Sequence, residues 1–323
     1  MSIKHFVSFL FIVLFAACRS SPNSAPDTPD SNSVASYFVN SNGNDNNDGL
    51  SEKSPFRTLT HAIEVASKTD VKRITVIGKL TENVSTIDTV PILPLPGKHW
   101  SEPNPGEILI TGKSNATAVE KAILTSNGGN ALTIAPMVSI MLENIEIRDC
   151  FGHSAVLVFK GQLILAKGVK IRSNLSRNGG GIYVTNGGTL IIRADAEVSN
   201  NNATDSGGGI YFEGGSRGLL AENALVTNNK AKNGGGIALN ESTFIMINNS
   251  EVKSNSAGNS GGGIYFHGEL VLQDGAKITE NTASKSGGGI YGASNDVSGT
   301  IDVNVKITGN RAPEFPDNNL GID

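Results

Sequence analysis

The chain has 323 residues, a formal net charge of −4, 38 glycines and only two cysteines. This acidic balance offers no basic surface for nucleic acid, so no nucleic-acid partner is expected. One cysteine, Cys18, belongs to the N-terminal leader described next, which leaves Cys150 without a partner and excludes an intrachain disulfide framework.

Residues 1–17 have the pattern of a signal peptide. A short basic start is followed by an apolar run of twelve residues, too short for a bilayer, which needs about 20. The run ends in Ala16-Ala17-Cys18, which resembles the lipobox of bacterial lipoproteins, although Phe15 stands where Leu is usual. The resemblance implies lipidation of Cys18. An ordinary cleaved signal with a chance cysteine is the alternative.

A lipid anchor makes a membrane the first expected partner. Several acyl chains hold a protein on a membrane, whereas a single chain binds only weakly. Arg19 follows Cys18, and resemblance to enterobacterial sorting rules favours the outer membrane because the residue is not Asp. Residues 18–36, rich in Ser, Pro, Asp and Asn, are expected to form a disordered tether. We therefore expect an exported protein at the outer membrane or cell surface.

Residues 37–68 are expected to form an N-terminal cap. Tyr37 to Val39 suit a first strand, and Ser54 and Pro55 suit the N-cap and first turn of a helix. The segment resembles the opening of many secreted β-helix proteins, including pectate-lyase-like ones. A helix there would plug the open apolar end of a solenoid. Its apolar face would comprise Phe56, Leu59, Ile63 and Ala66.

A polar turn in this cap suggests calcium. Asn44, Asn46, Asp48 and Gly49 have the spacing that opens an EF-hand loop. Loop position 12 is Pro55 instead of the bidentate Glu, so an EF-hand is rejected. A partial calcium site and an Asn/Asp turn that satisfies its own backbone both stay open. No other cofactor is expected.

Residues 69–323 contain a repeat of about 27 residues, regular over 169–312. Each unit has a triple glycine followed by Ile, and an Asn five or six residues before the triplet. The triplets begin at Gly179, Gly207, Gly234, Gly261 and Gly287, at intervals of 28, 27, 27 and 26 residues. The Asn positions, including a sixth copy without a triplet, are Asn174, Asn201, Asn229, Asn255, Asn281 and Asn310.

Each unit holds three short alternating runs, which predict three strands. No run is long enough for a crossover helix, so stacking gives an all-β fold, a single right-handed parallel β-helix with a short N-terminal capping helix. The Asn side chains would stack amide to amide. Cys150, 24 residues before Asn174, occupies the same ladder slot, and a buried thiol there is favoured over a catalytic one. Apolar runs before residue 125 predict wider early coils.

The units resemble the polymorphic outer-membrane-protein repeat. GGGIYV, GGGIYF and GGGIAL match its GG-A/I motif, and IRSN, VTNN and VKSN match its x-x-x-N motif. The resemblance implies a surface location and adhesion, with a host or matrix protein or a polysaccharide as partner. That family ends in a membrane-spanning barrel, whereas this chain stops at Asp323, so the lipid anchor would replace it.

No catalytic constellation is found, so enzymatic activity stays an open alternative. The strand before each ladder Asn carries a mixed-charge stripe without paired carboxylates, which a glycosidase would need. His153 lacks the companion motifs of polygalacturonases, and His267 has no partner that the sequence identifies. The irregular region 80–106, with Trp100, is the place where a glycan groove could form. A carbohydrate-active enzyme or glycan-binding module is therefore the alternative to an adhesin-like protein.

The residue after each triplet Ile should point outward. Because one coil advances about 4.8 Å, these residues form a stripe broken once, at Ala238. Such a stripe either stabilises the sheet through ring contacts or forms a docking strip, and we keep both interpretations. Its tyrosines are Tyr183, Tyr211, Tyr265 and Tyr291.

Overall fold

The computed structural model describes residues 35–86, 107–113, 121–293 and 298–314. Cys18, most of the tether and most of region 80–106, including Trp100, lie outside the described residues. From residue 35 onward the chain forms one compact unit. No described helix is long and apolar enough to cross a membrane.

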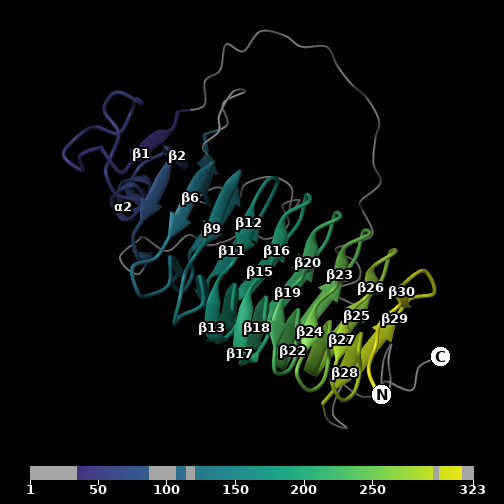
Figure 1. Cartoon of the computed structure of the whole chain (residues 1–323). Coiled ribbons are helices and arrows are strands. Elements are labelled where there is room, and N and C mark those ends of the chain that lie inside the picture. The colour runs from purple at the N-terminus through teal and green to yellow at the C-terminus, as the bar shows by residue number, and fades with distance from the viewer. Residues whose placement is uncertain (1–34, 87–106, 114–120, 294–297, 315–323) are drawn as a thin grey trace. The chain divides into compact units, whose positions relative to one another are not determined.

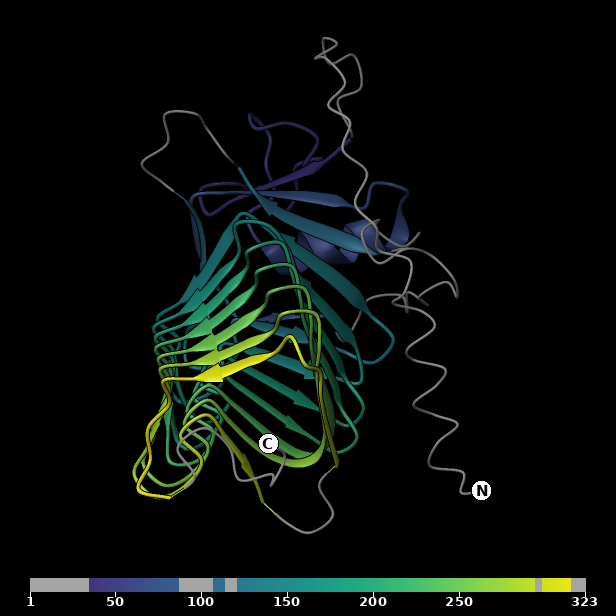
Figure 2. The same ribbon diagram turned by 90° about the vertical axis from the view of Figure 1, so that its right-hand side faces the viewer.

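The described chain winds into a parallel β-solenoid, which confirms the predicted fold class (Figure 1). Every strand pairing is parallel and joins one coil to the next, so the coils stack along one axis (Figure 2). The apolar core runs through the centre of this stack, lined by the inward side chains of all coils.

The strands form three sheets, one of which wraps around two faces of the solenoid. The 16-stranded sheet contains β1 (Tyr37–Asn40), β2 (Arg73–Ile77), β4 (Val84–Ser85), β5 (Ile108–Gly112), β7 (Leu132–Ile134), β8 (Ser139–Glu143), β10 (Val156–Phe159), β11 (Gln162–Leu165), β14 (Ile182–Thr185), β15 (Thr189–Ile192), β18 (Ile210–Glu213), β19 (Arg217–Leu220), β22 (Ile237–Met246), β25 (Ile264–Leu272), β28 (Ile290–Gly292) and β29 (Ser298–Ile301). The nine-stranded sheet contains β3 (Lys79–Thr81), β6 (Ala122–Thr125), β9 (Ile145–Arg148), β12 (Lys170–Arg172), β16 (Glu197–Ser199), β20 (Leu225–Thr227), β23 (Glu251–Lys253), β26 (Lys277–Thr279) and β30 (Lys306–Thr308). The five-stranded sheet contains β13 (Leu175–Asn178), β17 (Asn202–Ser206), β21 (Lys230–Ala231), β24 (Ser256–Ala257) and β27 (Thr282–Ala283).

Two features of these coils differ from the prediction of three strands per unit. The five-stranded sheet is a fourth strand position, made by the short segment after the ladder Asn, where four of the five strands contain an Ala and β13 has Ser176 in its place. In β22 and β25 the first two predicted runs merge into one strand, which passes through a register shift between Asn240 and Ser242. The early coils are wider, as expected: Ile74 pairs with Ile110, 36 residues away, while Ile171 pairs with Val198.

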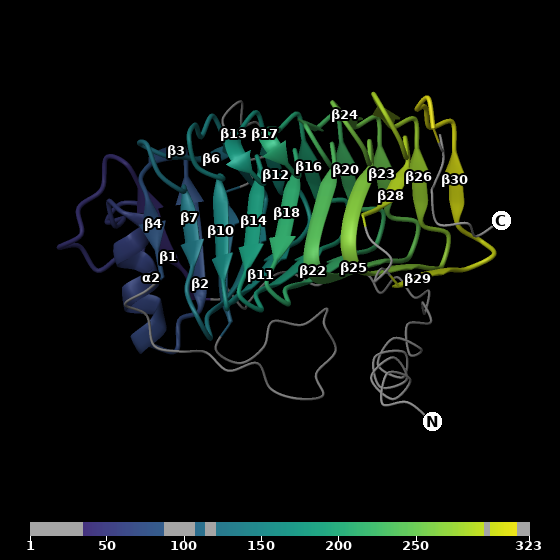
Figure 3. The same cartoon turned by 90° about the horizontal axis from the view of Figure 1, so that it is seen from below.

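Helix α2 (Leu59–Lys68) covers the N-terminal end of the solenoid (Figure 3). Leu59, Ile63 and Ala66 are buried, as predicted, so the helix turns its apolar face to the core. The predicted helix start is wrong, because the N-cap is Thr58, whose hydroxyl accepts a hydrogen bond from the His61 amide.

The residues expected at the helix start have other partners. Ser54 donates its hydroxyl to Asp48, and Phe56 forms a bridge with Val39 before the helix begins. Carboxylates from other segments accept hydrogen bonds from the backbone amides at the actual helix start. Asp45 accepts from the Thr58 amide, and Glu82 accepts from the Leu59 amide at 2.7 Å. Negative charge at a helix N-terminus is stabilising, so the cap is fixed by long-range contacts.

The ladder asparagines form a continuous stack of buried amides. Each side-chain amide donates to the carbonyl oxygen of the next Asn, at 2.9 Å from Asn174 to Asn201 and 3.0 Å from Asn229 to Asn255. That oxygen also accepts the backbone amide of the preceding Asn. Cys150 continues the ladder, since it is buried and its backbone amide donates to Asn174 at 3.1 Å.

Each position of a glycine triplet requires glycine for a different steric reason, as the triplet beginning at Gly234 illustrates. Gly234 has a φ of 58°, which favours glycine. A Cβ on Gly235 would lie 2.5 Å from the carbonyl oxygen of Gly262 in the next coil, and one on Gly236 would lie 2.9 Å from the Asn255 amide. The triplet therefore allows the coils to approach each other closely beside the ladder.

Candidate binding site on the tyrosine row

The tyrosines after the glycine triplets lie side by side on one face of the solenoid. Strand pairing places Tyr183 opposite Tyr211, Ala238 between Tyr211 and Tyr265, and Tyr265 opposite Tyr291. We call these five residues the tyrosine row. The four tyrosines are half-buried, so part of each ring is accessible from outside. The sequence pattern had predicted this row, including its break.

The rings contact each other in two pairs. The ring centroids of Tyr183 and Tyr211 are 5.3 Å apart and tilted, and those of Tyr265 and Tyr291 are 5.6 Å apart and stacked. Aromatic pairs are favourable at centroid separations of 4.5–7 Å. Each pair therefore contributes to the stability of its two coils, and Ala238 separates the pairs.

A second set of outward side chains lies two residues further along the same strands. We call Thr185, Glu213, Asn240 and His267 the polar row, and strand pairing places Glu213 opposite Asn240 and Asn240 opposite His267. The Tyr183 hydroxyl donates to the Glu213 carboxylate of the following coil. The two rows are thus linked by hydrogen bonds that step one coil forward.

The ring hydroxyls have altered acidity. Burial, and then the hydrogen bond to Glu213, raises the pKa of Tyr183 above its ordinary value of 10.0. Burial and the nearby carboxylates of Glu213 and Asp205 raise the pKa of Tyr211, and a hydrogen bond with the Asn240 side chain acts in the opposite direction. Both phenols therefore stay protonated at neutral pH and can donate hydrogen bonds.

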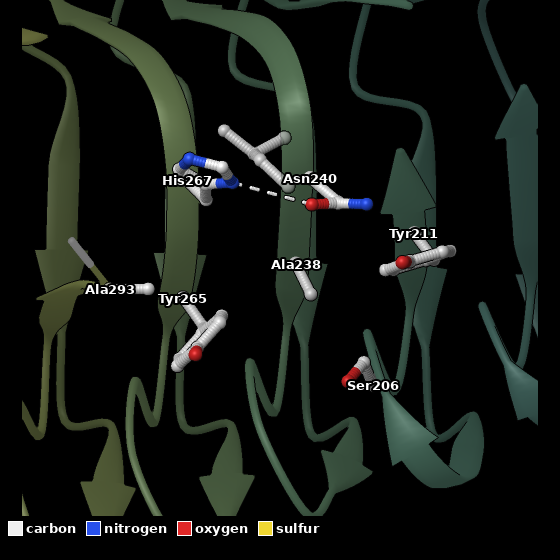
Figure 4. Close-up of a pocket in the computed structure, with 8 residues that line it drawn as sticks. Ser206, Tyr211, Ala238, Asn240, Tyr265, His267 and Ala293 are labelled. Atoms are coloured by element: carbon white, nitrogen blue, oxygen red, sulfur yellow. Dashed lines mark hydrogen bonds between the residues drawn. The ribbon is translucent and has the colours of Figure 1, made fainter. Parts of the chain in front are cut away.

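A hollow of about 420 Å³ lies at the break in the row, although the Ala238 side chain itself is buried. Figure 4 shows Ala238 between Tyr211 and Tyr265, with Asn240 and His267 on one side and Ser206 on the other. The Nδ1 atom of His267 lies 3.4 Å from the Asn240 side-chain oxygen, which gives this histidine the partner that the sequence did not reveal. The lining residues are Ser206, Tyr211, Ala238, Leu239, Asn240, Tyr265, His267 and Ala293.

Sequence analysis had not assigned Asn240 or Ser206 to a site. Asn240 could have been found, because it lies two residues after Ala238 and so faces the same side of the strand. Ser206 belongs to β17, and a bridge to Asn233 places it beside the following coil. That contact depends on the turn before the glycine triplet, which has no simple sequence pattern.

The charged stripe on the nine-stranded sheet forms ion pairs. The Lys170 Nζ atom lies 3.0 Å from a carboxylate oxygen of Glu197. The Arg172 guanidinium lies 2.5 Å from a carboxylate oxygen of Glu146, which is buried. These carboxylates neutralise bases of neighbouring coils, which is a structural role. His153, outside this sheet, is exposed.

The polar turn of the cap uses its side chains on its own backbone. Asn44 accepts the amide of Asn46, and Asp48 accepts the amide of Leu50, each across two residues. The Leu50 hydrogen bond, as the largest cause, holds the pKa of Asp48 below its ordinary range. In the described part of the chain, no three His, Cys, Asp or Glu side chains gather as a metal site. The geometry is that of an Asn/Asp turn whose side chains bind its own backbone.

Comparison with known families agrees with this architecture. The model of the right-handed β-helix region matches residues 106–312. The match covers more than half of the chain, so the protein belongs to the right-handed β-helix family. No curated protein and no solved structure matches the chain significantly.

Proposed function

We propose that the protein is an exported, lipid-anchored surface protein that binds a partner through its tyrosine row, in the manner of an adhesin. The observation that carries this proposal is the hollow at Ala238 between two pairs of half-buried tyrosine rings. Tyrosine is common in binding surfaces because it offers a large contact area at a low entropic cost. A rigid solenoid presents such residues at fixed spacing.

The chemistry of the hollow favours binding over hydrolysis. None of the eight residues that line it is Asp or Glu, whereas glycoside hydrolysis requires two carboxylates on either side of the scissile bond. Asn240, His267 and Ser206 supply groups that can orient a ligand by hydrogen bonds. A glycan-binding module is the second candidate, because these polar groups lie beside tyrosine rings. The polysaccharide arm of the binding assay below tests it directly.

The lipid anchor is tested through Cys18. If Cys18 is acylated, the wild-type protein partitions into the detergent phase and sediments with membranes, while Cys18→Ala is released or remains unprocessed. Equal membrane association of the two proteins would exclude the anchor.

Binding is tested with an array of extracellular-matrix proteins and polysaccharides. We expect the double variant Tyr211→Ser/Tyr265→Ser to lose binding, and Lys277→Ser/Lys306→Ser, on the nine-stranded sheet, to retain it. Thermal melts establish that both variants are folded. A folded tyrosine double variant that keeps full affinity for a captured partner would refute the role of the row.

A further inference from the structure

The two ends of the solenoid differ. Helix α2 covers the N-terminal end, whereas at the other end β30 is the outermost strand of the nine-stranded sheet among the residues that the structure describes (Figure 3). Three inward side chains of this last coil are only partly buried, although their counterparts one coil earlier are fully buried. They are Ile301, Val305 and Ile307 in the last coil, and Leu272, Ala276 and Ile278 in the coil before it. A free strand edge and apolar side chains therefore occur together at this end.

The backbone of β30 presents hydrogen-bonding groups along this edge. The Lys306 amide donates to a carbonyl of the previous coil, and the Thr308 carbonyl accepts an amide from it. Because successive residues of a strand direct their backbone groups to opposite sides, the amide and the carbonyl of Ile307 point away from the previous coil. The Val305 carbonyl and the Gly309 amide point the same way, since their counterparts one coil earlier bond to β30.

These four groups are arranged symmetrically. The Val305 acceptor lies two residues before Ile307, and the Gly309 donor lies two residues after it. An antiparallel copy of β30 centred on Ile307 would satisfy all four: the two Ile307 residues would exchange two hydrogen bonds, and each Val305 carbonyl would accept the Gly309 amide of the other copy. An edge strand is a template for pairing with another chain, and a two-fold interface requires a surface that is complementary to itself.

The charged side chains around β30 fit the same arrangement. Asp302 lies before the start of the strand and Arg311 lies after its end, and both are exposed. In an antiparallel pair the start of one strand lies at the end of the other, so each Asp302 approaches the Arg311 of the second copy. Lys306 lies opposite Thr308 of the second copy, so no like charges are directly opposed. Lys306 is not specific to the edge, because Lys277 occupies the same position inside the sheet.

We propose that the protein forms a two-fold dimer with a second copy of itself, joined end to end by antiparallel pairing of β30. The pairing brings the partly exposed apolar side chains of the two last coils together, so the core continues across the junction and further apolar surface is removed from water. This inference goes beyond the proposed function, because it concerns the end of the solenoid and is independent of the tyrosine row.

The first test measures the mass of the full-length protein in mild detergent by analytical ultracentrifugation over a range of concentrations. We expect a reversible equilibrium between monomer and dimer. Asp302→Arg and Arg311→Asp should each weaken dimerisation at least threefold, because each places like charges at both contacts, and the double exchange should restore it. A protein that is monomeric at all concentrations would overturn the proposal, and so would a dimer that both single variants leave unchanged.

Cross-linking of the same full-length protein locates the contact. With the strands centred on Ile307, the two Thr308 side chains are diagonal neighbours about 7–8 Å apart. Thr308→Cys should therefore be joined to its copy by a bismaleimide linker of similar length. Thr279→Cys is the matched control, because it lies in the same column but one coil, about 4.8 Å, further from the junction in each copy. Cys150 is buried, so the wild type gives the background. Equal linking of the two variants, or none in Thr308→Cys, would overturn the proposal.

Discussion

The amide ladder makes a quantitative prediction at Asn229, in the middle of the regular repeats. This side chain is 1% exposed and makes four hydrogen bonds. It donates to the Val198 carbonyl and to Asn255, both at 3.0 Å, and its oxygen accepts the backbone and side-chain amides of Asn201. Asn229→Ala removes all four.

The lost bonds are not equivalent. The backbone amide of Asn201 donates to Asn229 and has no second acceptor, so it becomes a buried unsatisfied donor, at a cost of about 1–3 kcal/mol. The Asn201 side-chain amide keeps its bond to Ile171, so that loss is closer to an ordinary hydrogen bond, about 0.5–1.5 kcal/mol. If each of the two donor bonds of Asn229 is also counted as an ordinary hydrogen bond, we expect Asn229→Ala to destabilise the protein by about 2.5–7.5 kcal/mol.

The control lies at the adjacent position. Asn228 is exposed, but its φ of 55° is in the left-handed region, where Ala is strained by about 1 kcal/mol or more. Asn228→Gly fits this conformation and should change the stability by less than about 0.5 kcal/mol. Glycine is therefore the correct neutral substitution here.

The assay must resolve local effects, because long repeat arrays do not always unfold in a two-state manner. Native-state hydrogen exchange measures the free energy of opening at individual amides. We expect the Asn201 amide to lose protection in Asn229→Ala and to keep it in Asn228→Gly, with urea melts giving the global change. Equal protection of Asn201 in both variants would show that the ladder does not stabilise the coils as we calculate.

Three further predictions follow from individual contacts. Gly235→Ala should destabilise the protein by about 2 kcal/mol or more, the cost of overpacking, because its Cβ would lie 2.5 Å from the Gly262 carbonyl oxygen. Gly258→Ala is the control and should be neutral, because the nearest atom to its Cβ is 3.8 Å away. Equal stability of the two variants in urea melts would contradict this prediction. The raised pKa of Tyr183 favours its protonated form in the folded state, so stability is retained below the unfolded pKa of 10.0 and decreases as pH rises above it. Tyr183→Phe should lessen this alkaline loss, and an identical pH profile would refute the contribution. Cys150 is buried and its thiol pKa is raised mainly by that burial, so a thiol reagent should modify it only after unfolding; rapid labelling of the native protein would contradict its burial.

The parts of the structure that repeat were the parts that sequence could predict. The inward Ile, the ladder Asn and the outward Tyr recur at one spacing, so their roles and register followed from alternation and from the turn residues. The fourth strand position was missed because three of its five strands, such as Lys230–Ala231, are only two residues long, and their pairing is defined by neighbouring coils instead of a local pattern.

The N-terminal cap shows a different limit. Ser54 and Pro55 form a strong local signal for a helix start, but Ser54 is bound to Asp48 and the helix begins at Leu59. The deciding contacts come from Asp45 and Glu82, which are 13 and 23 residues away from the amides that they accept. A single-sequence pattern does not contain such distant pairings, so tertiary contacts overrode the local preference.

The tyrosine row contains one departure from the repeat, at Ala238. In a solenoid, every coil must satisfy nearly the same packing requirements, so a departure from the repeat has to be explained by something other than the coil itself. Ala238 stands where four other coils have Tyr, and an aromatic pair is worth about 0.5–1.5 kcal/mol beyond its buried area. The strand around Ala238 has the same register as its neighbours, with Ile237 buried and opposite Ile264, so the backbone presents no obstacle to a ring. Ala238 is itself only 1% exposed, so its side chain is already covered by its neighbours, and the two tyrosine pairs form separate contacts on either side of it.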